Sequence, residues 1–198
     1  MKLLGVTGGL AMGKSMAATF LRRMEIPVVD TDDLARQLVR SGQPALKEIV
    51  ARFGDDLLDD HGELKRSLLA ARVFPDARRL GELESILHPP IREQWLATTA
   101  RWRQEGHAIG AVIIPLLFET SAEECFDLIV CLACSEATQL DRLRARGWTE
   151  EQIAQRLSHQ WPVATKVAKA DYLVWTDVPE SIHRDQLSVI VEQELISR

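Results

Sequence analysis

Short apolar runs alternate with helical patterns along most of the chain. Five runs have the length and composition of buried strands: Leu3 to Thr7, Pro27 to Asp30, Ile109 to Ile114, Leu128 to Leu132, and Tyr172 to Trp175. Consecutive parallel strands need crossover connections, which are usually helices. The alternation therefore predicts an α/β fold in which helices cover both sides of a five-stranded parallel sheet.

Helical patterns fill the segments between the apolar runs. Two extend from Lys14 to Met24 and from Glu136 to Arg146, and a third begins at Thr149, which forms a capping box with Gln152. The last helix is expected to begin near Pro179, a favourable first-turn residue. Its apolar residues share one face at helical spacing and should pack on the sheet. They are Leu187, Ile190, Val191 and Leu195.

From about Leu34 to Arg103 the chain has several helical patterns and no convincing strand. Proline should interrupt these patterns, because it lacks a backbone donor and clashes with the preceding helical turn. The expected interruptions are Gly42-Gln43-Pro44, Phe74-Pro75 and His88-Pro89-Pro90. The pattern predicts a helical insert rather than a separate domain.

Composition and charge narrow the class of protein. Of the 198 residues, 46% are apolar and 27% are charged, which is typical of soluble globular proteins. The net charge of -5 argues against a general nucleic-acid-binding domain, which usually carries a basic face. The longest apolar stretch, Ala108 to Phe118, is much shorter than the roughly 20 residues that cross a bilayer. We therefore expect a cytoplasmic protein that binds neither nucleic acid nor membranes.

The three cysteines, Cys125, Cys131 and Cys134, lack the spacing of a disulfide framework and fit a reducing compartment. The pair Cys131-x-x-Cys134 has the spacing of some metal and redox sites. However, Cys131 lies in a predicted strand, and positions three apart on a strand point to opposite faces. We therefore favour structural roles for both.

The segment from Gly8 to Ser15 reads Gly-Gly-Leu-Ala-Met-Gly-Lys-Ser and matches the phosphate-binding pattern G-x-x-x-x-G-K-[S/T] of a P-loop. It lies directly after a predicted strand and before a predicted helix. Glycines let backbone N–H groups turn toward phosphate oxygens, and the helix adds its positive N-terminal dipole. Lys14 would bind the β- and γ-phosphates, and the hydroxyl group of Ser15 would bind Mg²⁺. The candidate ATP-binding residues are Gly8, Gly9, Ala11, Met12, Gly13, Lys14, Ser15 and Met16.

A P-loop leaves three classes open: a small-molecule kinase, a GTPase or motor-type ATPase, and a nucleotide-dependent binding protein. GTPases carry an Asn-Lys-x-Asp motif, which does not occur in this sequence. Motor-type ATPases usually end a buried strand in Asp, whereas Ile109 to Ile114 continues into Pro115. Both observations favour a kinase.

The second predicted strand ends in Asp30, and Asp32 and Asp33 follow it. The carboxyl ends of parallel strands border the ligand crevice of α/β folds, so an acid there can face the γ-phosphate. We interpret Asp33 as a cap of the next helix. Asp32 fits either a cap or a catalytic acid from these residues alone.

Taken together, these motifs give the whole chain a resemblance to the dephospho-coenzyme A kinase family. Apart from the P-loop each matching piece is weak alone, but their order and spacing are specific. The pieces are Thr7-Gly8-Gly9 with Gly13-Lys14-Ser15; Asp30-Thr31-Asp32 with Ala35-Arg36; Leu87-His88-Pro89; Pro115 to Glu119; Gln139-Leu140-x-Arg142; and Lys169 to Tyr172. The family transfers the γ-phosphoryl group of ATP to the 3′-hydroxyl of dephospho-coenzyme A.

The resemblance implies a role for each part of the chain. It implies a three-layer P-loop core of residues 1–31, 104–135 and 168–198, an acceptor-binding insert of about 32–103, and a lid of about 136–167. Asp32 would activate the acceptor hydroxyl. The candidate catalytic residues are therefore Asp32, Lys14 and Arg142, the acceptor-binding residues are Asp32, Arg66, Arg72, His88 and Arg92, and the lid arginines are Arg142 and Arg146. Taken singly, the arginines of the insert also fit solvated helix residues, and His88 fits a helix end.

The resemblance further implies ATP and Mg²⁺ as substrate and cofactor and dephospho-coenzyme A as the acceptor. We expect a monomer, and the sequence leaves an oligomer open as well. A nucleoside monophosphate kinase of the same architecture is the second hypothesis. A nucleotide-dependent binding protein is the third.

The chain departs from the family pattern in two places. Ala11, Met12 and Met16 replace the Gly, Ser and Thr that are usual there. If Ala11 adopts a positive φ, strain of about 1 kcal/mol or more would weaken ATP binding. The last predicted strand continues into Thr176 and Asp177 instead of an Asn-containing loop, so the adenine contacts stay open. Two tryptophans fit either stacking on adenine or packing; they are Trp161 and Trp175.

Overall fold

The computed structural model describes residues 1–196, which form two compact units. The sheet unit contains Met1–Asp30 and the chain from Thr99 onward, and the helical unit contains Thr31–Thr98. The helical unit follows the second strand and precedes the third strand in the sequence.

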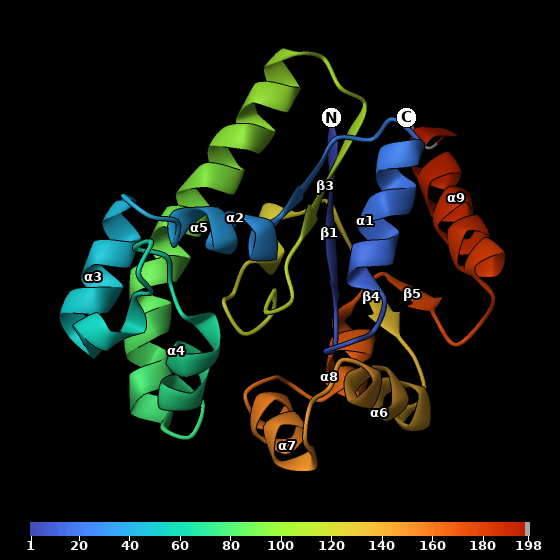
Figure 1. Ribbon diagram of the computed structural model, residues 1–198. Coiled ribbons are helices and arrows are strands. Elements are labelled where there is room, and N and C mark those ends of the chain that lie inside the picture. The colour runs from blue at the N-terminus through green and yellow to red at the C-terminus, as the bar shows by residue number, and fades with distance from the viewer. Residues whose placement is uncertain (197–198) are drawn as a thin grey trace. The chain divides into compact units, whose positions relative to one another are not determined.

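Five parallel strands form the sheet in the order β2-β3-β1-β4-β5. The strands are β1 (Lys2–Gly8), β2 (Val28–Asp30), β3 (Ile109–Ile113), β4 (Leu128–Ala133) and β5 (Tyr172–Trp175). All five predicted strands and the α/β fold are therefore confirmed. Because β1 lies at the centre of the sheet (Figure 1), the loop after it begins at the middle of the sheet's carboxyl edge.

The helices of the sheet unit also follow the predicted pattern. They are α1 (Lys14–Arg23), α6 (Glu136–Ala145), α7 (Glu150–Ser158), α8 (Val163–Lys169) and α9 (Glu180–Ile196), with a short 3₁₀ turn, η2 (Glu123–Cys125). The predicted capping box is present, since Thr149 Oγ1 accepts from the Gln152 N–H at 3.3 Å and Gln152 Oε1 accepts from the Thr149 N–H at 3.2 Å.

Apolar side chains pack on both faces of the sheet. On one face α1 lies beside α9 (Figure 1), and their apolar residues form the main core with those of the strands. On the strands themselves, two glycines leave room for large side chains. A Cβ on Gly110 would lie 2.8 Å from the Trp102 ring, and one on Gly5 would lie 2.8 Å from Leu117 and Phe126. Larger residues at either position would therefore push these side chains apart.

The last helix differs from the prediction at one residue. Leu187, Ile190 and Val191 are buried as predicted, but Leu195 is 41% exposed. Leu195 follows Leu187 by eight residues, which places it about 80° further around the helix axis. It therefore lies at the margin of the apolar face.

Carboxylate groups bind backbone N–H groups near the start of two strands. Asp127 Oδ2 accepts from the Leu3 N–H, and Asp171 Oδ2 accepts from the Ile129 N–H, both at 2.7 Å. These bonds give Asp171, within the Lys169 to Tyr172 piece of the resemblance, a structural role in the sheet.

The helical unit has its own apolar core. It contains α2 (Thr31–Leu38), α3 (Pro44–Phe53), α4 (Arg66–Val73), the 3₁₀ turn η1 (Asp55–Leu57) and most of α5 (Ala77–Gln104). The buried residues of this core are Val39, Ile49, Phe53, Leu57, Leu69, Val73 and Leu80. One isolated antiparallel bridge joins Leu58 and Leu64.

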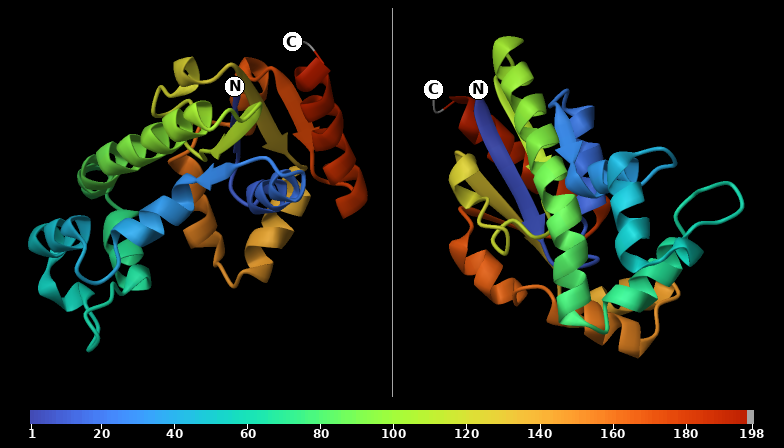
Figure 2. Two further views of the ribbon diagram at one scale, coloured as in Figure 1. Left: turned by 90° about the horizontal axis from the view of Figure 1, so that it is seen from above. Right: turned by 90° about the vertical axis from the view of Figure 1, so that its left-hand side faces the viewer.

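Two of the three expected helix interruptions are present, and the third is wrong. One helix begins at Pro44, and another ends just before Phe74-Pro75, as expected. Helix α5, however, continues through Pro89 and Pro90 as one helix of 28 residues (Figure 2). The fixed φ of proline is compatible with a helix, and its cost is a lost donor and a steric clash. Packing of the preceding turns on the core offsets that cost; the apolar residues are Leu80, Leu83, Ile86 and Leu87. His88 therefore lies within a helix and not at a helix end.

None of the helices formed by residues 1–196 combines the length and the apolar composition needed to cross a membrane.

Candidate active site

The P-loop between β1 and α1 depends on three residues with positive φ. They are Gly8 at 146°, Ala11 at 58° and Gly13 at 85°. A Cβ on Gly8 would lie 2.4 Å from the Leu132 carbonyl oxygen, so only glycine fits there. Ala11 has a side chain at a positive φ, and this left-handed conformation costs about 1 kcal/mol or more.

Lys14 lies over the loop that precedes it. Its ammonium group donates to the Gly8 carbonyl at 2.9 Å and to the Gly9 carbonyl at 2.7 Å. Helix α1 begins at Lys14, and its N-cap residue, Gly13, has no side chain to bind the N–H groups of the first turn. These groups and the ammonium group form a site for phosphate oxygens.

Ser15 and Met16 are exposed in the first turn of α1. The Ser15 hydroxyl suits a Mg²⁺ ion that keeps phosphate oxygens and water as its other ligands. Among residues 1–196, no group of three or more His, Cys, Asp or Glu side chains is arranged to hold a metal ion. A Mg²⁺ ion at Ser15 would therefore take its remaining ligands from a bound nucleotide and from water.

The side chains of Ala11 and Met12 point into the protein core. Met12 is 2% exposed and packs with Ala133, Cys134, Val163 and Val167. Its side chain is therefore not part of the phosphate surface, and a contact between Met12 and ATP would use its backbone. Ala11 belongs to a separate apolar cluster, which is formed mainly by residues of α6 and α7. The other members of this cluster are Leu10, Leu140, Leu143, Trp148, Ile153 and Leu157.

Arg142 joins the P-loop to the end of the last strand. From α6 it donates to the Ala11 carbonyl at 3.3 Å, to Thr176 Oγ1 at 3.0 Å and to the Thr176 carbonyl at 2.6 Å. The next residue, Asp177, accepts from Ser135 Oγ at 2.5 Å and from Thr138 Oγ1 at 2.6 Å. These two bonds lower the pKa of Asp177. The segment after β5 is thus held firmly beside the P-loop.

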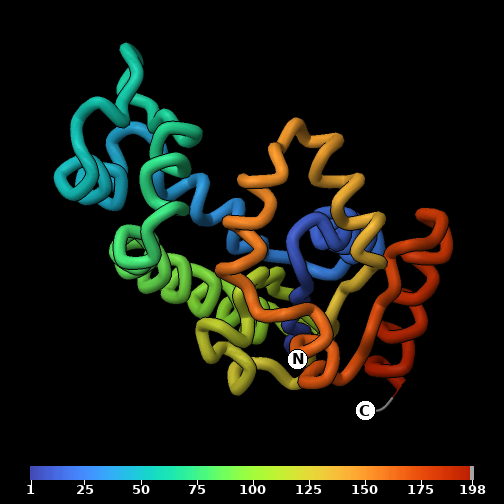
Figure 3. The backbone as a smooth tube through the Cα atoms, turned by 90° about the horizontal axis from the view of Figure 1, so that it is seen from below, coloured from blue at the N-terminus to red at the C-terminus, as the bar shows by residue number. Residues whose placement is uncertain are grey.

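Helices α6, α7 and α8 arch around the P-loop when the sheet unit is seen from below (Figure 3). Arg146 is exposed at the end of α6, and Gly147 turns the chain with a φ of 78°. Other arginines of the arch have partners: Arg144 pairs with Glu150 at 2.7 Å, and Arg156 lies 4.2 Å from the centre of the Trp148 ring. Arg146 is the more accessible of the two predicted lid arginines.

The two tryptophans that were open to adenine stacking have different surroundings. Trp161 is stacked on Phe118, with ring centroids 6.1 Å apart. Trp175 is 40% exposed, and its peptide group exchanges two 2.9 Å hydrogen bonds with the Gln186 amide. Trp161 is nearly as exposed as Trp175, at 38%, so both tryptophans stay candidates for adenine stacking.

The predicted catalytic acid, Asp32, lies in the helical unit, where it is exposed in the first turn of α2. Asp33 is in the same turn and pairs with Arg36 at 2.5 Å. The predicted capping role of Asp33 is wrong because the helix already begins at Thr31, which makes Asp33 a first-turn acid.

The predicted acceptor-binding residues are spread over the helical unit. Arg66 donates to the Arg36 carbonyl at 3.3 Å. Arg72 forms a two-pronged ion pair with Asp56, at 2.6 and 3.0 Å, and also donates to the Phe53 carbonyl. Arg72 would have to leave these partners to bind a phosphate group. The remaining two lie on α5, and they are the half-buried His88 and the exposed Arg92.

Sequence reasoning missed two buried polar residues near the P-loop. Lys166 on α8 is fully buried and pairs with Glu119 at 2.7 Å. A charged residue between Val163 and Val167 of a short helix was the available signal. His183 on α9 is 4% exposed, and its ring meets Phe20 edge-on at 5.2 Å.

The structure supports neither metal nor redox chemistry at Cys131. Its thiol is fully buried, and burial raises its pKa to about 11. The thiolate that metals and oxidants require is therefore scarce at neutral pH.

We predict that burial of His183 makes the protein less stable in mild acid. Burial, and secondly the positive charge of Arg142, lower the pKa of His183, whereas Glu180 acts in the opposite direction. The unfolded chain therefore binds a proton at this residue more readily than the folded protein does. The free energy of unfolding should be highest above about pH 6.5 and should fall as the pH drops toward the lowered pKa.

Urea unfolding at pH 7.5, 6.0 and 5.0 measures this effect. His183→Leu should flatten the pH dependence, and the exposed His61→Gln should leave it unchanged. The same slope in His183→Leu as in the wild type would assign the acid effect to other groups.

A P-loop after the central strand of a parallel sheet, with Lys14 over the loop, places the protein among the P-loop nucleotide-binding proteins. A family model described as dephospho-CoA kinase matches residues 2–179. The chain belongs to the dephospho-CoA kinase family.

Individual relatives agree with this assignment. A dephospho-CoA kinase from Bdellovibrio bacteriovorus is 39% identical over 174 residues, which are 88% of this chain and 87% of the relative. One from Shouchella clausii is 42% identical over 172 residues, 86% of this chain and 87% of the relative. A crystal structure of a Thermus thermophilus protein has a TM-score of 0.77 and 28% identity, and the match covers 96% of this chain and 97% of that one.

Proposed function

We propose that this protein transfers the γ-phosphoryl group of ATP to the 3′-hydroxyl of dephospho-CoA, giving CoA and ADP. Family membership supports the reaction, since the family model covers residues 2–179. The single structural observation that carries it is the position of Lys14, whose ammonium group lies over the carbonyl groups of Gly8 and Gly9. We expect the reaction to take place in the cytoplasm.

In this proposal the sheet unit binds ATP. Amide groups of the P-loop and of the first turn of α1 bind phosphate oxygens, and Lys14 exchanges its loop carbonyls for oxygens of the transferring group. Mg²⁺, held through Ser15, would neutralise negative charge on the phosphates. Arg142 keeps the segment after β5 beside the loop, where adenine would lie.

Asp32 of the helical unit would act on the acceptor. In a loose phosphoryl-transfer transition state the attacking oxygen is barely bonded, so the base mainly orients the hydroxyl group and takes its proton late. A carboxylate of ordinary basicity is sufficient for that role.

A coupled assay of ADP release tests the function. We expect turnover with dephospho-CoA that exceeds turnover with AMP, CMP or water alone by several orders of magnitude. Preference for AMP or CMP would indicate a nucleoside monophosphate kinase. Equal slow release with every acceptor and with water would indicate a nucleotide-dependent binding protein.

Arg142→Ala is expected to lower kcat more than it raises the KM for ATP. On lid closure Arg142 would donate to the transferring phosphoryl group, and removal of one such donor typically lowers kcat by about 10²-fold. Arg142 also holds Thr176 in place. Steady-state kinetics with ATP as the varied substrate measure kcat and the KM for ATP. Arg184→Ala is a matched control, because Arg184 is exposed on α9 and pairs only locally with Asp185. An effect on KM alone would limit Arg142 to binding ATP in the ground state.

A further inference from the structure

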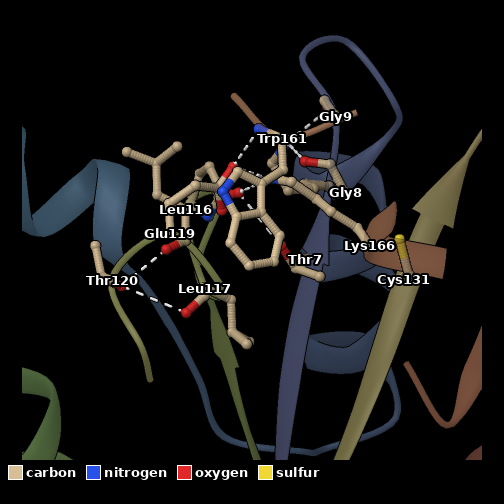
Figure 4. A network of polar contacts seen from close by, with 12 residues as sticks. Thr7, Gly8, Gly9, Leu116, Leu117, Glu119, Thr120, Cys131, Trp161 and Lys166 are labelled. Atoms are coloured by element: carbon tan, nitrogen blue, oxygen red, sulfur yellow. Dashed lines mark hydrogen bonds and ion pairs between the residues drawn. The ribbon is translucent and has the colours of Figure 1, made fainter. Parts of the chain in front are cut away.

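Lys166 and Glu119 form a buried ion pair in the sheet unit (Figure 4). Lys166 is 0% exposed, its ammonium group lies 2.7 Å from Glu119 Oε1, and it also donates to the Pro115 carbonyl at 2.8 Å. Glu119 Oε1 accepts a further hydrogen bond from the Trp161 N–H at 2.8 Å. Glu119, in the segment that follows β3, thus binds both Lys166 of α8 and Trp161, which lies just before α8.

Stability alone is a weak explanation for this pair. Two charges lose their hydration when they are buried, and apolar residues of similar volume are often as stabilising in such places or more so. The bonds of an ion pair are directional, however, and they define one position for the helix that carries them. Helix α8 needs such contacts, because a helix of seven residues is not stable alone.

The contacts of α8 lead to the P-loop on two sides. The Pro115 carbonyl that binds Lys166 also accepts from Thr7 Oγ1 at 3.3 Å, and Thr7 is the residue before the loop. From α8 itself, Val163 and Val167 pack with Met12 of the loop. The position of α8 and the position of the P-loop are therefore linked through one buried network.

We propose that Lys166 is a positioning residue, which together with Glu119 fixes α8 and the adjoining end of α7 against the P-loop. The proposal rests on the proposed function and on the assignment of α6 to α8 as a lid. With α8 fixed, the lid closes in one place and excludes water from the γ-phosphate. With α8 loose, a water oxygen bonds to the γ-phosphorus, the bond to the bridging oxygen of ADP breaks, and phosphate and a proton go to solvent.

The test compares wasteful hydrolysis with productive transfer. In the double variant Lys166→Met/Glu119→Leu both charges are removed, so neither remains buried and unpaired. We expect a folded protein in which kcat for transfer falls about tenfold, as a displacement of under 1 Å can cause. Phosphate release per dephospho-CoA phosphorylated should rise at least about fivefold. Loss of folded protein alone would lower both rates equally and leave this ratio unchanged.

Lys169→Met is the matched control. Lys169 lies on the same helix and pairs with Glu123 at 3.5 Å, but its side chain is 44% exposed. We expect the wild-type ratio and kcat in this variant. A wild-type ratio in the double variant would overturn the proposal. If the double variant does not fold, Lys166→Leu/Glu119→Met replaces it, since it also removes both charges and fills the space with apolar side chains. A wild-type ratio in that folded variant would also overturn the proposal.

Hydrogen exchange separates this proposal from the proposed function. If the wild type phosphorylates no dephospho-CoA, the function fails, and the position of α8 is still measured by amide exchange with and without Mg²⁺ and ATP. We expect faster exchange in Glu150–Ser158 and Val163–Lys169 of the double variant than in the wild type. Equal exchange in the two proteins would contradict a positioning role.

Discussion

Replacement of Asp32 by asparagine is expected to lower kcat for transfer by about 10²- to 10⁴-fold, while ATP still binds. Asparagine keeps the size and hydrogen-bonding shape of the side chain but accepts no proton. The acceptor hydroxyl would lose both its orientation and its proton acceptor. The measurements are ADP release with saturating dephospho-CoA and calorimetric titration with Mg²⁺ and ATP.

Asp33→Asn provides the matched control for that variant. Asp33 is the next residue, lies in the same helical turn, and is engaged with Arg36 at 2.5 Å. Loss of an exposed ion pair of this kind lowers the free energy of unfolding by about 0.5 kcal/mol or less, so the variant should stay folded. Because Asp33 has no role in the proposed reaction, kcat should stay within about twofold of the wild type. Unchanged turnover in Asp32→Asn, or an equal loss in both variants, would remove Asp32 from the mechanism.

The sheet was predictable because its strands are short, apolar and buried. β3 and β4 are buried along their whole length, so nearly every position in them is apolar and each reads as a strand. The helix through Pro89 and Pro90 was not predictable by the same rules. Local propensity opposes a helix there. The preceding turns of α5 offset this by packing on residues far away in the chain, which a local pattern does not reveal.

The P-loop was predictable for a different reason. The path of the loop needs glycine at Gly8, because a Cβ there would meet the Leu132 carbonyl. Phosphate binding needs a lysine at the start of the helix, which is Lys14. Such requirements act on residues close in sequence and leave a recognisable spacing. The positive φ of Ala11, which the pattern left as a condition, is present in the structure.

Side-chain partners across the fold could not be deduced from one sequence. The direction of the Met12 side chain depends on Val163 and Val167, and the pairing of Lys166 with Glu119 depends on how α8 meets the segment after β3. Both are contacts between residues far apart in the chain. The sequence shows that Met12 replaces a family serine, but it does not show that the Met12 side chain packs with Ala133, Cys134 and residues of α8.

Lys14→Met is expected to have the second large effect, and a different one from Asp32→Asn. Methionine keeps most of the length of lysine but has no ammonium group, so the carbonyl groups of Gly8 and Gly9 lose their donor. Loss of one preorganised cation at a developing charge lowers kcat by about 10²- to 10³-fold. ATP should also bind more weakly, because the same group binds phosphate oxygens before the reaction.

Three readouts distinguish this outcome from a folding defect: kcat for ADP release, the Kd for Mg²⁺ and ATP, and the melting temperature without ligand. The exposed Lys47→Met on α3 removes the same charge from the helical unit and should leave all three unchanged. Slow hydrolysis by water should fall together with transfer in Lys14→Met, since both acceptors attack the same phosphoryl group, whereas Asp32→Asn should lower transfer selectively. Wild-type kcat and Kd in Lys14→Met would mean that the P-loop does not bind the reacting phosphates, and the proposed function would then fail as well.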